Sequence, residues 1–278
     1  LEGSLMLRDY CREHDIPMHE CGTIVVARNS EEENRLENLL QMGLEVGVPC
    51  LRIIGRDELK EKETAIEGTK ALFSPTGAIV NSTALVASIA NEAKSLGAHY
   101  HMGCKVESIE KDMVTTNYGR FKSDQIINCA GLYCDKIAHM MHMGLDFMVV
   151  PFKGSYMKIN LPINSMVYHV PDLRYPFLGV HLTKSIDGKV IAGPTAELSW
   201  RGREAYDRKT DISEFLEMLK SINFLRLVSN SEFLKIAAQN FRITISKKTF
   251  INEVNSFLTG RKISECDIHP YKCGIRAQ

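Results

Sequence analysis

The sequence lacks the glycine-rich loops with which most nucleotide-binding proteins hold a pyrophosphate. Neither G-x-G-x-x-G nor G-x-x-x-x-G-K-[ST] occurs in its 278 residues, so the usual pyrophosphate fingerprint is excluded within this chain. Long apolar runs are missing as well. The best local run, 147–152, is six residues long and includes Pro151, whereas a membrane span needs about 18 apolar residues. We therefore expect no transmembrane segment.

Paired cysteines and metal-ligand patterns are also absent. The eight cysteines include no C-x-x-C pair, and no histidine stands at a spacing that would complete a zinc site. The histidine pairs 99/101 and 139/142 have no obvious third ligand, so we predict no metal site. Scattered cysteines in a chain of this length indicate reduced, buried thiols and a reducing compartment.

The sequence has no excess of either charge. Lys and Arg number 34, Asp and Glu number 34, and the formal net charge is zero. A nucleic-acid binder usually shows a basic excess on at least one domain, so this partner class is not expected. Residues 201–278 carry 14 basic and 9 acidic side chains, or +5, and the first 200 carry −5. This mild asymmetry can serve an anionic ligand or belong to a solvated surface.

What the sequence does contain is an alternation of helix and strand patterns. Ser30 and Glu33 form a capping-box pattern that opens a helix with leucines at helical spacing. Thr83 is the expected cap of another helix, which Gly97 ends. In chain order we expect a helix at 5–14, a strand at 22–27, a helix at 30–44, a strand at 51–54, helices at 57–63 and 83–93, a strand at 99–107 and a small meander around 114–121.

The following segment predicts a strand, a glycine turn and a helix. We expect residues 125–129 to form a buried strand, and Ala130-Gly131 breaks it before a helix at 132–141. This order of elements is typical of the second half of a nucleotide-binding α/β domain. Its first half, with the phosphate loop, is expected before residue 1.

From residue 148 the pattern becomes antiparallel β. Asp187-Gly188 is a strong hairpin signal between two of the predicted strands, and helical periodicity returns over 211–259. The strands are expected at 149–159, 166–170, 177–184 and 189–193. A sheet with helices clustered after it predicts a separate α+β substrate domain.

The first candidate site is the turn Ala130-Gly131-Leu132. A strand that ends in Ala-Gly lets the backbone approach a planar ring or a phosphate at the start of the following helix. A plain tight turn between a strand and a helix gives the same sequence. From the residues alone both interpretations stay open.

The second candidate is His181. Strand alternation puts Leu178, Val180 and Leu182 on one face and His181 on the other, beside Gly179. The glycine leaves room for a ligand, and imidazole can accept a proton near neutral pH. The alternative is a histidine on an ordinary solvated or partly buried face.

Two basic candidates complete the set. Arg276 follows Gly274 in a short strand pattern and can hold a substrate carboxylate through a bidentate pair, or it is a surface arginine. The segment Trp200-Arg201-Gly202-Arg203 is a basic and aromatic loop that either covers an anionic ligand or is solvated.

Several blocks together resemble one known family. They are LEGSLML at 1–7, CAGLY at 129–133, VPFKGSY at 150–156, VPD at 170–172, PFLGVHL at 176–182 and GIRAQ at 274–278. In these blocks the chain is similar to the L-2-hydroxyglutarate dehydrogenases, which belong to the wider D-amino-acid-oxidase-like FAD-dependent oxidoreductases. The resemblance runs through the whole chain, is strongest at 125–195 and fades between about 210 and 265.

The resemblance implies an FAD-dependent enzyme that oxidises L-2-hydroxyglutarate to 2-oxoglutarate. By position it implies that Val106 lies near the FAD adenine, that Ala130, Gly131 and Leu132 lie against the cofactor, that His181 faces the flavin from the substrate sheet and that Arg276 binds a substrate carboxylate. The implied partners are a small 2-hydroxy dicarboxylate and an electron acceptor that the sequence does not identify. The eukaryotic members of the family imply a mitochondrial location.

The chain departs from that family at its ends. The family's glycine-rich FAD loop, a histidine that follows it and a flavin-contacting C-terminal stretch are absent, so we expect the intact protein to be longer. The missing histidine is an alternative general base, in which case His181 orients the substrate. Two other functions stay open: a related FAD-dependent oxidase of a 2-hydroxy or 2-amino acid, and a non-catalytic fragment without the phosphate loop.

The predicted fold class combines α/β and α+β. A partial, Rossmann-like FAD-binding domain is expected at 71–143, with 1–15 and 266–278. It is interleaved with an antiparallel-sheet substrate domain at 16–70 and 144–265.

Overall fold

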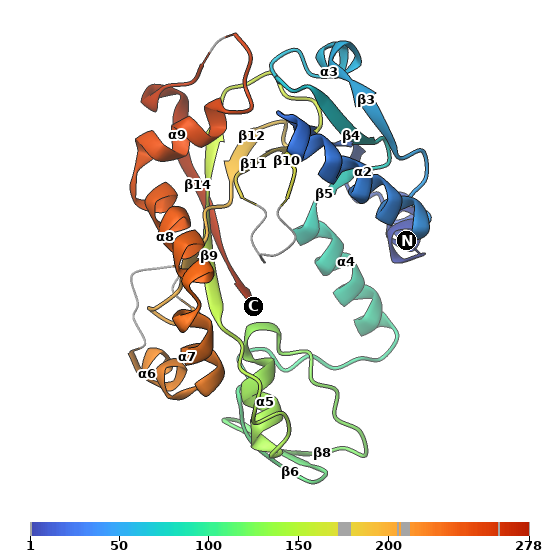
Figure 1. The fold of residues 1–278 in the computed structure, drawn as a ribbon. Coiled ribbons are helices and arrows are strands. Elements are labelled where there is room, and N and C mark those ends of the chain that lie inside the picture. The colour runs from blue at the N-terminus through green and yellow to red at the C-terminus, as the bar shows by residue number, and fades with distance from the viewer. Residues whose placement is uncertain (1, 172–178, 205, 207–211, 261, 278) are drawn as a thin grey trace. The chain divides into compact units, whose positions relative to one another are not determined.

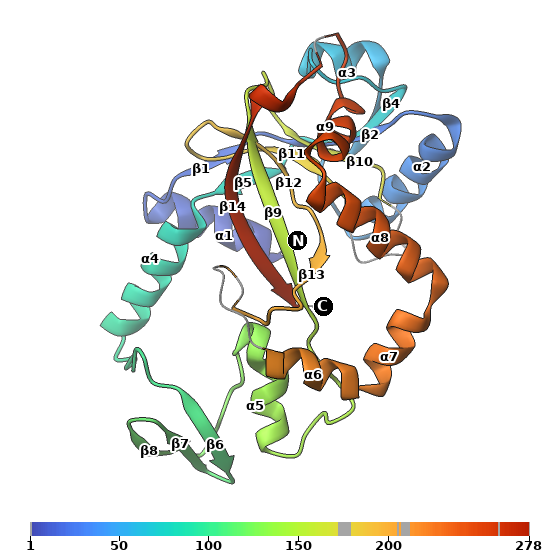
Figure 2. The same ribbon diagram turned by 90° about the vertical axis from the view of Figure 1, so that its left-hand side faces the viewer.

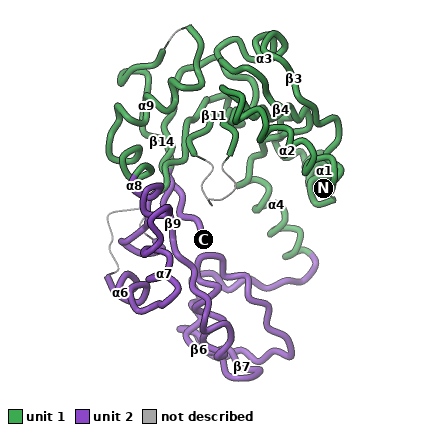
Figure 3. The backbone as a smooth tube through the Cα atoms, in the orientation of Figure 1, with its two compact units in different colours: residues 1–95, 155–196, 239–272 green, residues 96–154, 197–238, 273–278 purple. Residues whose placement is uncertain are grey.

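A computed structural model describes residues 2–171, 179–204, 206, 212–260 and 262–277. The chain divides into two compact units (Figure 3). Unit 1 comprises 1–95, 155–196 and 239–272, and unit 2 comprises 96–154, 197–238 and 273–278. The chain thus forms two interleaved units. The predicted division into a cofactor domain and a substrate domain assigns functions to other ranges and stays a prediction.

Unit 1 contains most of the strands. The helices and strands are labelled in Figures 1 and 2. Its first elements are α1 (Glu2–Glu13), β1 (Met18–Glu20), β2 (Thr23–Ala27), α2 (Ser30–Glu45), β3 (Arg52–Gly55), α3 (Arg56–Lys62), β4 (Lys70–Ser74), β5 (Ala78–Val80) and α4 (Ser82–Ser95). Later segments add β10 (Met166–His169), β11 (His181–Lys184), β12 (Val190–Gly193), α9 (Lys247–Asn255) and the 3-10 turn η2 (Glu265–Asp267).

Unit 2 is smaller. It contains the meander β6 (Val106–Glu110), β7 (Met113–Thr116) and β8 (Gly119–Lys122), the 3-10 turn η1 (Gly131–Tyr133), α5 (Cys134–Met140), β13 (Glu197–Leu198), α6 (Ile212–Lys220) and α7 (Ile222–Ser229). Three elements have residues in both units: β9 (Pro151–Ile159), α8 (Ser231–Ile245) and β14 (Ile268–Ala277).

The main sheet has the strand order β13-β9-β12-β11-β10-β2-β4-β3, and β14 also pairs with β9. β2 and β10 pair in parallel, with Tyr168 opposite Val25, while the other neighbours in that order are antiparallel. Because successive side chains on a strand point to opposite faces, this register divides the residues of the sheet into two sets.

One set forms the main core. Ile24, Val26, Val167, Leu182 and Ala192 are fully buried on the same face of the sheet. The same hydrophobic cluster takes in Phe250, Ile251 and Val254 from α9. We refer to this side as the core face.

The opposite side is covered by α2 over part of its width. Leu36 of α2 packs with Ala27 and Leu72, and Val25 packs against the same cluster. Tyr168, His181 and Gly193 belong to this side by their register with Val25 and with one another. We refer to the side that bears these residues as the His181 face.

Most predicted elements are confirmed. The Asp187-Gly188 hairpin joins β11 to β12, and Gly188 has a φ of +78°. The strand predicted at 177–184 also included residues 177 and 178, which lie outside the described part of the chain. The two helix caps were wrong by one or two positions: Asn29 accepts the Glu32 amide at 2.9 Å, and Asn81 accepts the Ala84 amide at 3.1 Å. Clustered Asn, Ser and Thr residues offer several caps, and geometry selects among them.

Two predicted strands were wrong. The strand expected at 99–107 begins only at Val106, and residues 125–129 form no strand. A strand needs a neighbour to take its backbone hydrogen bonds, and within the described residues no other strand pairs with 125–129. Ile127 is 80% exposed as a result, although the sequence pattern predicted burial.

His169 is a polar residue on the core face. It is 8% exposed, stacks on Phe257 with ring centroids 3.5 Å apart, and its Nε2 atom lies 3.1 Å from the hydroxyl oxygen of Ser256. Burial, together with the charge of Arg28, lowers its pKa to about 3. The folded protein therefore holds this imidazole neutral.

A buried neutral histidine makes stability depend on pH. The unfolded chain takes up a proton near the ordinary pKa of 6.5, while the folded chain does not, so this contribution to stability is present above 6.5 and is lost as the pH falls toward 3. Between pH 7 and pH 5 we expect His169 to account for a loss of about 2 kcal/mol in the free energy of unfolding. Urea titrations of wild type and His169→Phe at both pH values measure it. In His169→Phe the free energy of unfolding should fall by about 2 kcal/mol less between pH 7 and pH 5 than in wild type. In His99→Phe, a change at an exposed histidine, it should fall as much as in wild type. Equal changes in all three proteins contradict the prediction.

Candidate functional site

His181 is the first residue of β11, and the register gives it two neighbours across the sheet. Tyr168 lies opposite it on β10, because Val167 pairs with Leu182 in an antiparallel ladder. Gly193 of β12 pairs with it on the other side. The rings of Tyr168 and His181 stack, with centroids 4.5 Å apart and planes inclined by 29°. His181 is half-buried and lies beside an aromatic ring. Its catalytic role stays a proposal.

Gly193 is a point of close approach. A Cβ atom built there would lie 2.8 Å from the carbonyl oxygen of Ser155 and 2.9 Å from the ring of Tyr156, and the φ of +140° disfavours any side chain. The ring of Tyr156 thus occupies the space beside the glycine. Tyr156 of β9, Tyr168 of β10 and His181 of β11 therefore lie on the His181 face.

The turn predicted to contact the cofactor lies in unit 2. Ala130 and Gly131 are exposed, Gly131 has a φ of +55°, and nothing lies within 4 Å of the position that its Cβ would take. A flat ring system can therefore approach the backbone here. Helix α5 follows the turn and packs against β6, whose first residue is the half-buried Val106.

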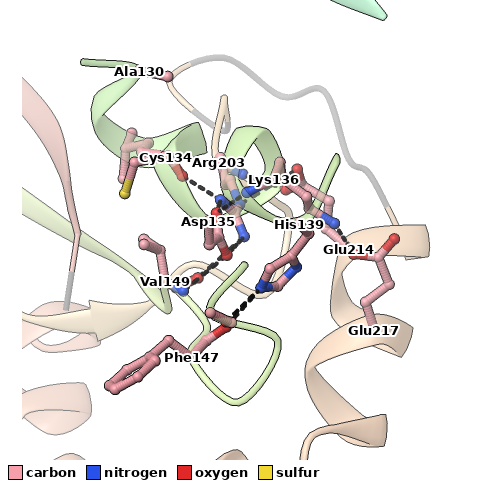
Figure 4. A network of polar contacts seen from close by, with 12 residues as sticks. Ala130, Cys134, Asp135, Lys136, His139, Phe147, Val149, Arg203, Glu214 and Glu217 are labelled. Carbon is pink, nitrogen blue, oxygen red and sulfur yellow. Dashed lines mark hydrogen bonds and ion pairs between the residues drawn. The ribbon is translucent and has the colours of Figure 1, made fainter. Parts of the chain in front are cut away.

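A buried ion pair lies directly behind this turn (Figure 4). The guanidinium of Arg203 donates to both carboxylate oxygens of Asp135, at 2.5 and 2.8 Å, and the two side chains are 4% and 5% exposed. Arg203 also donates to the carbonyl of Leu132 and, at 3.3 Å, to that of Val149. One arginine thus connects the turn at 130–132, α5 and the segment before β9.

The pair and the backbone beside it have further polar contacts. The amide of Val149 donates to Asp135 at 2.9 Å, and Glu214 of α6 accepts from the backbone amide of Arg203 at 2.7 Å. Burial acts to raise the pKa of Asp135, but the hydrogen bonds from Arg203 and Val149 outweigh it and hold that pKa below its usual value. The carboxylate is therefore charged, and bidentate pairing compensates its desolvation.

Arg276 lies on β14 in the unit 2 part of that strand. Its side chain is half-buried, and its Nε atom is buried without a hydrogen-bond partner among the described residues. Buried donors are normally paired. An arginine with a buried, unpartnered donor is suited to an anionic ligand such as a carboxylate.

The described residues are compatible with a bound flavin but supply only part of its site. The open turn at Gly131 accommodates the approach of a ring, and no phosphate loop occurs in the sequence. In the described ranges, no group of three or more His, Cys, Asp or Glu side chains is arranged to hold a metal ion. No helix there is long and apolar enough to cross a membrane.

Sequence reasoning missed the two residues with the richest contacts. Arg203 was assigned to a loop that is solvated or covers an anion, and Asp135 was not singled out. The sequence shows only an arginine in a loop and an aspartate in the first turn of a predicted helix. Each of these is common, and neither by itself predicts a buried ion pair. Tyr168 was missed for a similar reason, because nothing local indicates that it faces His181.

Comparison with known proteins defines the class. The family model described as FAD dependent oxidoreductase matches residues 1–226, and the chain belongs to this family. The whole chain aligns with the L-2-hydroxyglutarate dehydrogenase of Indibacter alkaliphilus at 34% identity, covering 71% of that protein. It aligns in full with the mitochondrial L-2-hydroxyglutarate dehydrogenase of Homo sapiens at 30% identity, covering 64% of it. The chain therefore spans about two thirds of the length of these relatives.

A solved structure supports the fold alone. Glycine oxidase from Geobacillus kaustophilus superposes with a TM-score of 0.68 over 100% of this chain and 66% of its own, at 16% sequence identity. The predicted combination of a Rossmann-like FAD fold with an antiparallel sheet is confirmed by this likeness and by the family match.

The buried pair gives a stability prediction. Arg203→Ala leaves the Asp135 carboxylate buried without its cation, and removing one partner of such a pair is expected to lower the free energy of unfolding by about 3–5 kcal/mol. Arg201→Ala, in the same loop but exposed, should change it by less than about 0.5 kcal/mol. Urea unfolding of both variants measures the difference; similar values for the two arginines contradict the assignment.

Proposed function

We propose that the protein oxidises L-2-hydroxyglutarate to 2-oxoglutarate with FAD as the cofactor. The observation that supports this most strongly is the full-length alignment with L-2-hydroxyglutarate dehydrogenases at 34% and 30% identity. The proposal includes a mitochondrial location because the human relative is named as mitochondrial. The name of the bacterial relative gives no such location.

The chemistry needs a hydride acceptor, a proton acceptor and a binder of carboxylates. FAD, when bound, supplies the hydride acceptor. We assign to Ala130, Gly131 and Leu132 the role of a backbone surface for the flavin, because this turn is open and has no side chain at Gly131. Val106 is assigned to the adenine end, on the strand against which α5 packs.

His181 is the proposed proton acceptor for the substrate hydroxyl. An imidazole titrates near neutrality and can take the proton as the C–H bond is oxidised. If another histidine in the rest of the protein takes that proton, His181 instead holds the hydroxyl by a hydrogen bond. In both cases it contacts the substrate.

Arg276 is the proposed carboxylate binder. L-2-hydroxyglutarate carries two carboxylates, and a guanidinium can pair with one of them through two parallel hydrogen bonds. The buried Nε atom without a partner is the feature that supports this role. Pairing fixes the substrate and removes the unsatisfied donor at once.

The activity is tested directly on the protein purified in its full natural length. We expect a yellow protein with a flavin absorbance spectrum that L-2-hydroxyglutarate bleaches without air, coupled to reduction of an artificial dye. The D enantiomer, glycine and proline complete the substrate panel. Colourless protein, or flavin that L-2-hydroxyglutarate leaves oxidised, contradicts the proposal, and turnover of an amino acid in its place identifies a related oxidase.

Replacing Arg276 tests carboxylate binding. Loss of a charge-assisted hydrogen-bonded pair removes about 1.5–3 kcal/mol of binding, so Arg276→Gln should raise KM by about 10- to 150-fold. Lys272→Gln changes an exposed cation on the same strand and should leave KM within about twofold of wild type. Steady-state kinetics with matched flavin content measure both. An unchanged KM in Arg276→Gln removes this residue from the site.

A further inference from the structure

The side chain of His181 has an asymmetric setting on its sheet. Of its two cross-strand neighbours, only Tyr168 has a side chain, because the other is Gly193. Directly opposed residues on one face interact through their side chains. Of these two neighbours, only Tyr168 can therefore orient the imidazole through a side-chain contact.

Tyr168 has packed neighbours on both sides. Thr183 lies two residues beyond His181 on β11 and therefore on the same face as the Tyr168 ring. At the other side, Val25 on β2 is the direct partner of Tyr168. Val25 packs against the cluster formed by Leu36 of α2 with Ala27 and Leu72.

These contacts link a rigid part of unit 1 to the imidazole. The order is the α2 cluster, Val25, Tyr168 and His181, and each step is a direct pairing or packing contact. Burial raises the pKa of the Tyr168 hydroxyl. The ring thus stays a neutral phenol, which stacks on imidazole without adding a charge beside it.

We propose that Tyr168 is a positioning residue that holds the imidazole of His181 in its productive orientation by ring stacking. The proposal rests on the proposed function, in which His181 contacts the substrate hydroxyl. Reaction rates are sensitive to misplacement of a reacting group by about 1 Å, which lowers them by about 100-fold. Loss of the stack therefore affects kcat in the first place.

The variants separate the ring from its hydroxyl. Tyr168→Leu removes the ring and should lower kcat by about 10- to 100-fold, while KM changes by less than about threefold because Arg276 still binds the carboxylate. Tyr168→Phe keeps the stack and should retain at least about a third of the wild-type kcat. Tyr118→Leu, a change at a tyrosine that is 74% exposed, is the matched control and should behave as wild type.

A spectroscopic measurement tests the stack without any turnover. The ring current of Tyr168 shifts the His181 imidazole protons upfield, so their resonances should move downfield in Tyr168→Leu and stay close to wild type in Tyr168→Phe. His181→Gln identifies these resonances by removing them. If Tyr168→Leu fails to fold, Tyr168→Val provides the same comparison, since a β-branched residue suits the strand.

The outcomes are distinct for the two proposals. Tyr168→Leu with a kcat within about twofold of wild type, or with unshifted His181 resonances, overturns the positioning role while the dehydrogenase activity stands. Flavin-loaded wild type that leaves L-2-hydroxyglutarate untouched overturns the proposed function instead, and the resonances alone then decide whether Tyr168 holds the imidazole. A kcat loss together with the downfield shift, rescued in Tyr168→Phe, supports the proposal.

Discussion

The ion pair between Asp135 and Arg203 is the constraint on which unit 2 depends. Two full charges at 4% and 5% exposure are tolerated because they pair with each other and have further polar partners, among them the carbonyl of Leu132 and the amide of Val149. The pair holds together segments that are distant in sequence. The role proposed for the turn at Gly131 requires a backbone that is anchored without being covered, and the buried arginine anchors it from behind.

Unit 1 obtains its rigidity in a different way. Its sheet has an apolar core face under α9 and a second face that α2 covers over β2 and β4. Strand alternation then requires that the side chains not directed into the main core emerge on the His181 face. The polar and aromatic residues proposed to serve the substrate are therefore positioned by the same register that buries Leu182 and Ala192.

Each unit contains some of the residues to which a role is proposed. Unit 1 contributes His181 and its tyrosine neighbour, whereas unit 2 contributes the open turn at Gly131 and Arg276. The chain spans 71% and 64% of the length of two relatives.

The sequence by itself determined the local elements and the family. Helical leucine spacing predicted α2, Asp187-Gly188 predicted the β11–β12 hairpin, and short blocks such as CAGLY identified the relatives, because each depends on neighbours within a few residues. Tertiary structure alone decided that Arg203 is buried against Asp135, that Tyr168 stacks on His181, and that Ile127 is exposed. These outcomes depend on pairing partners from 13 to 68 positions away. No local pattern encodes them, since burial and pairing are properties of the packed chain.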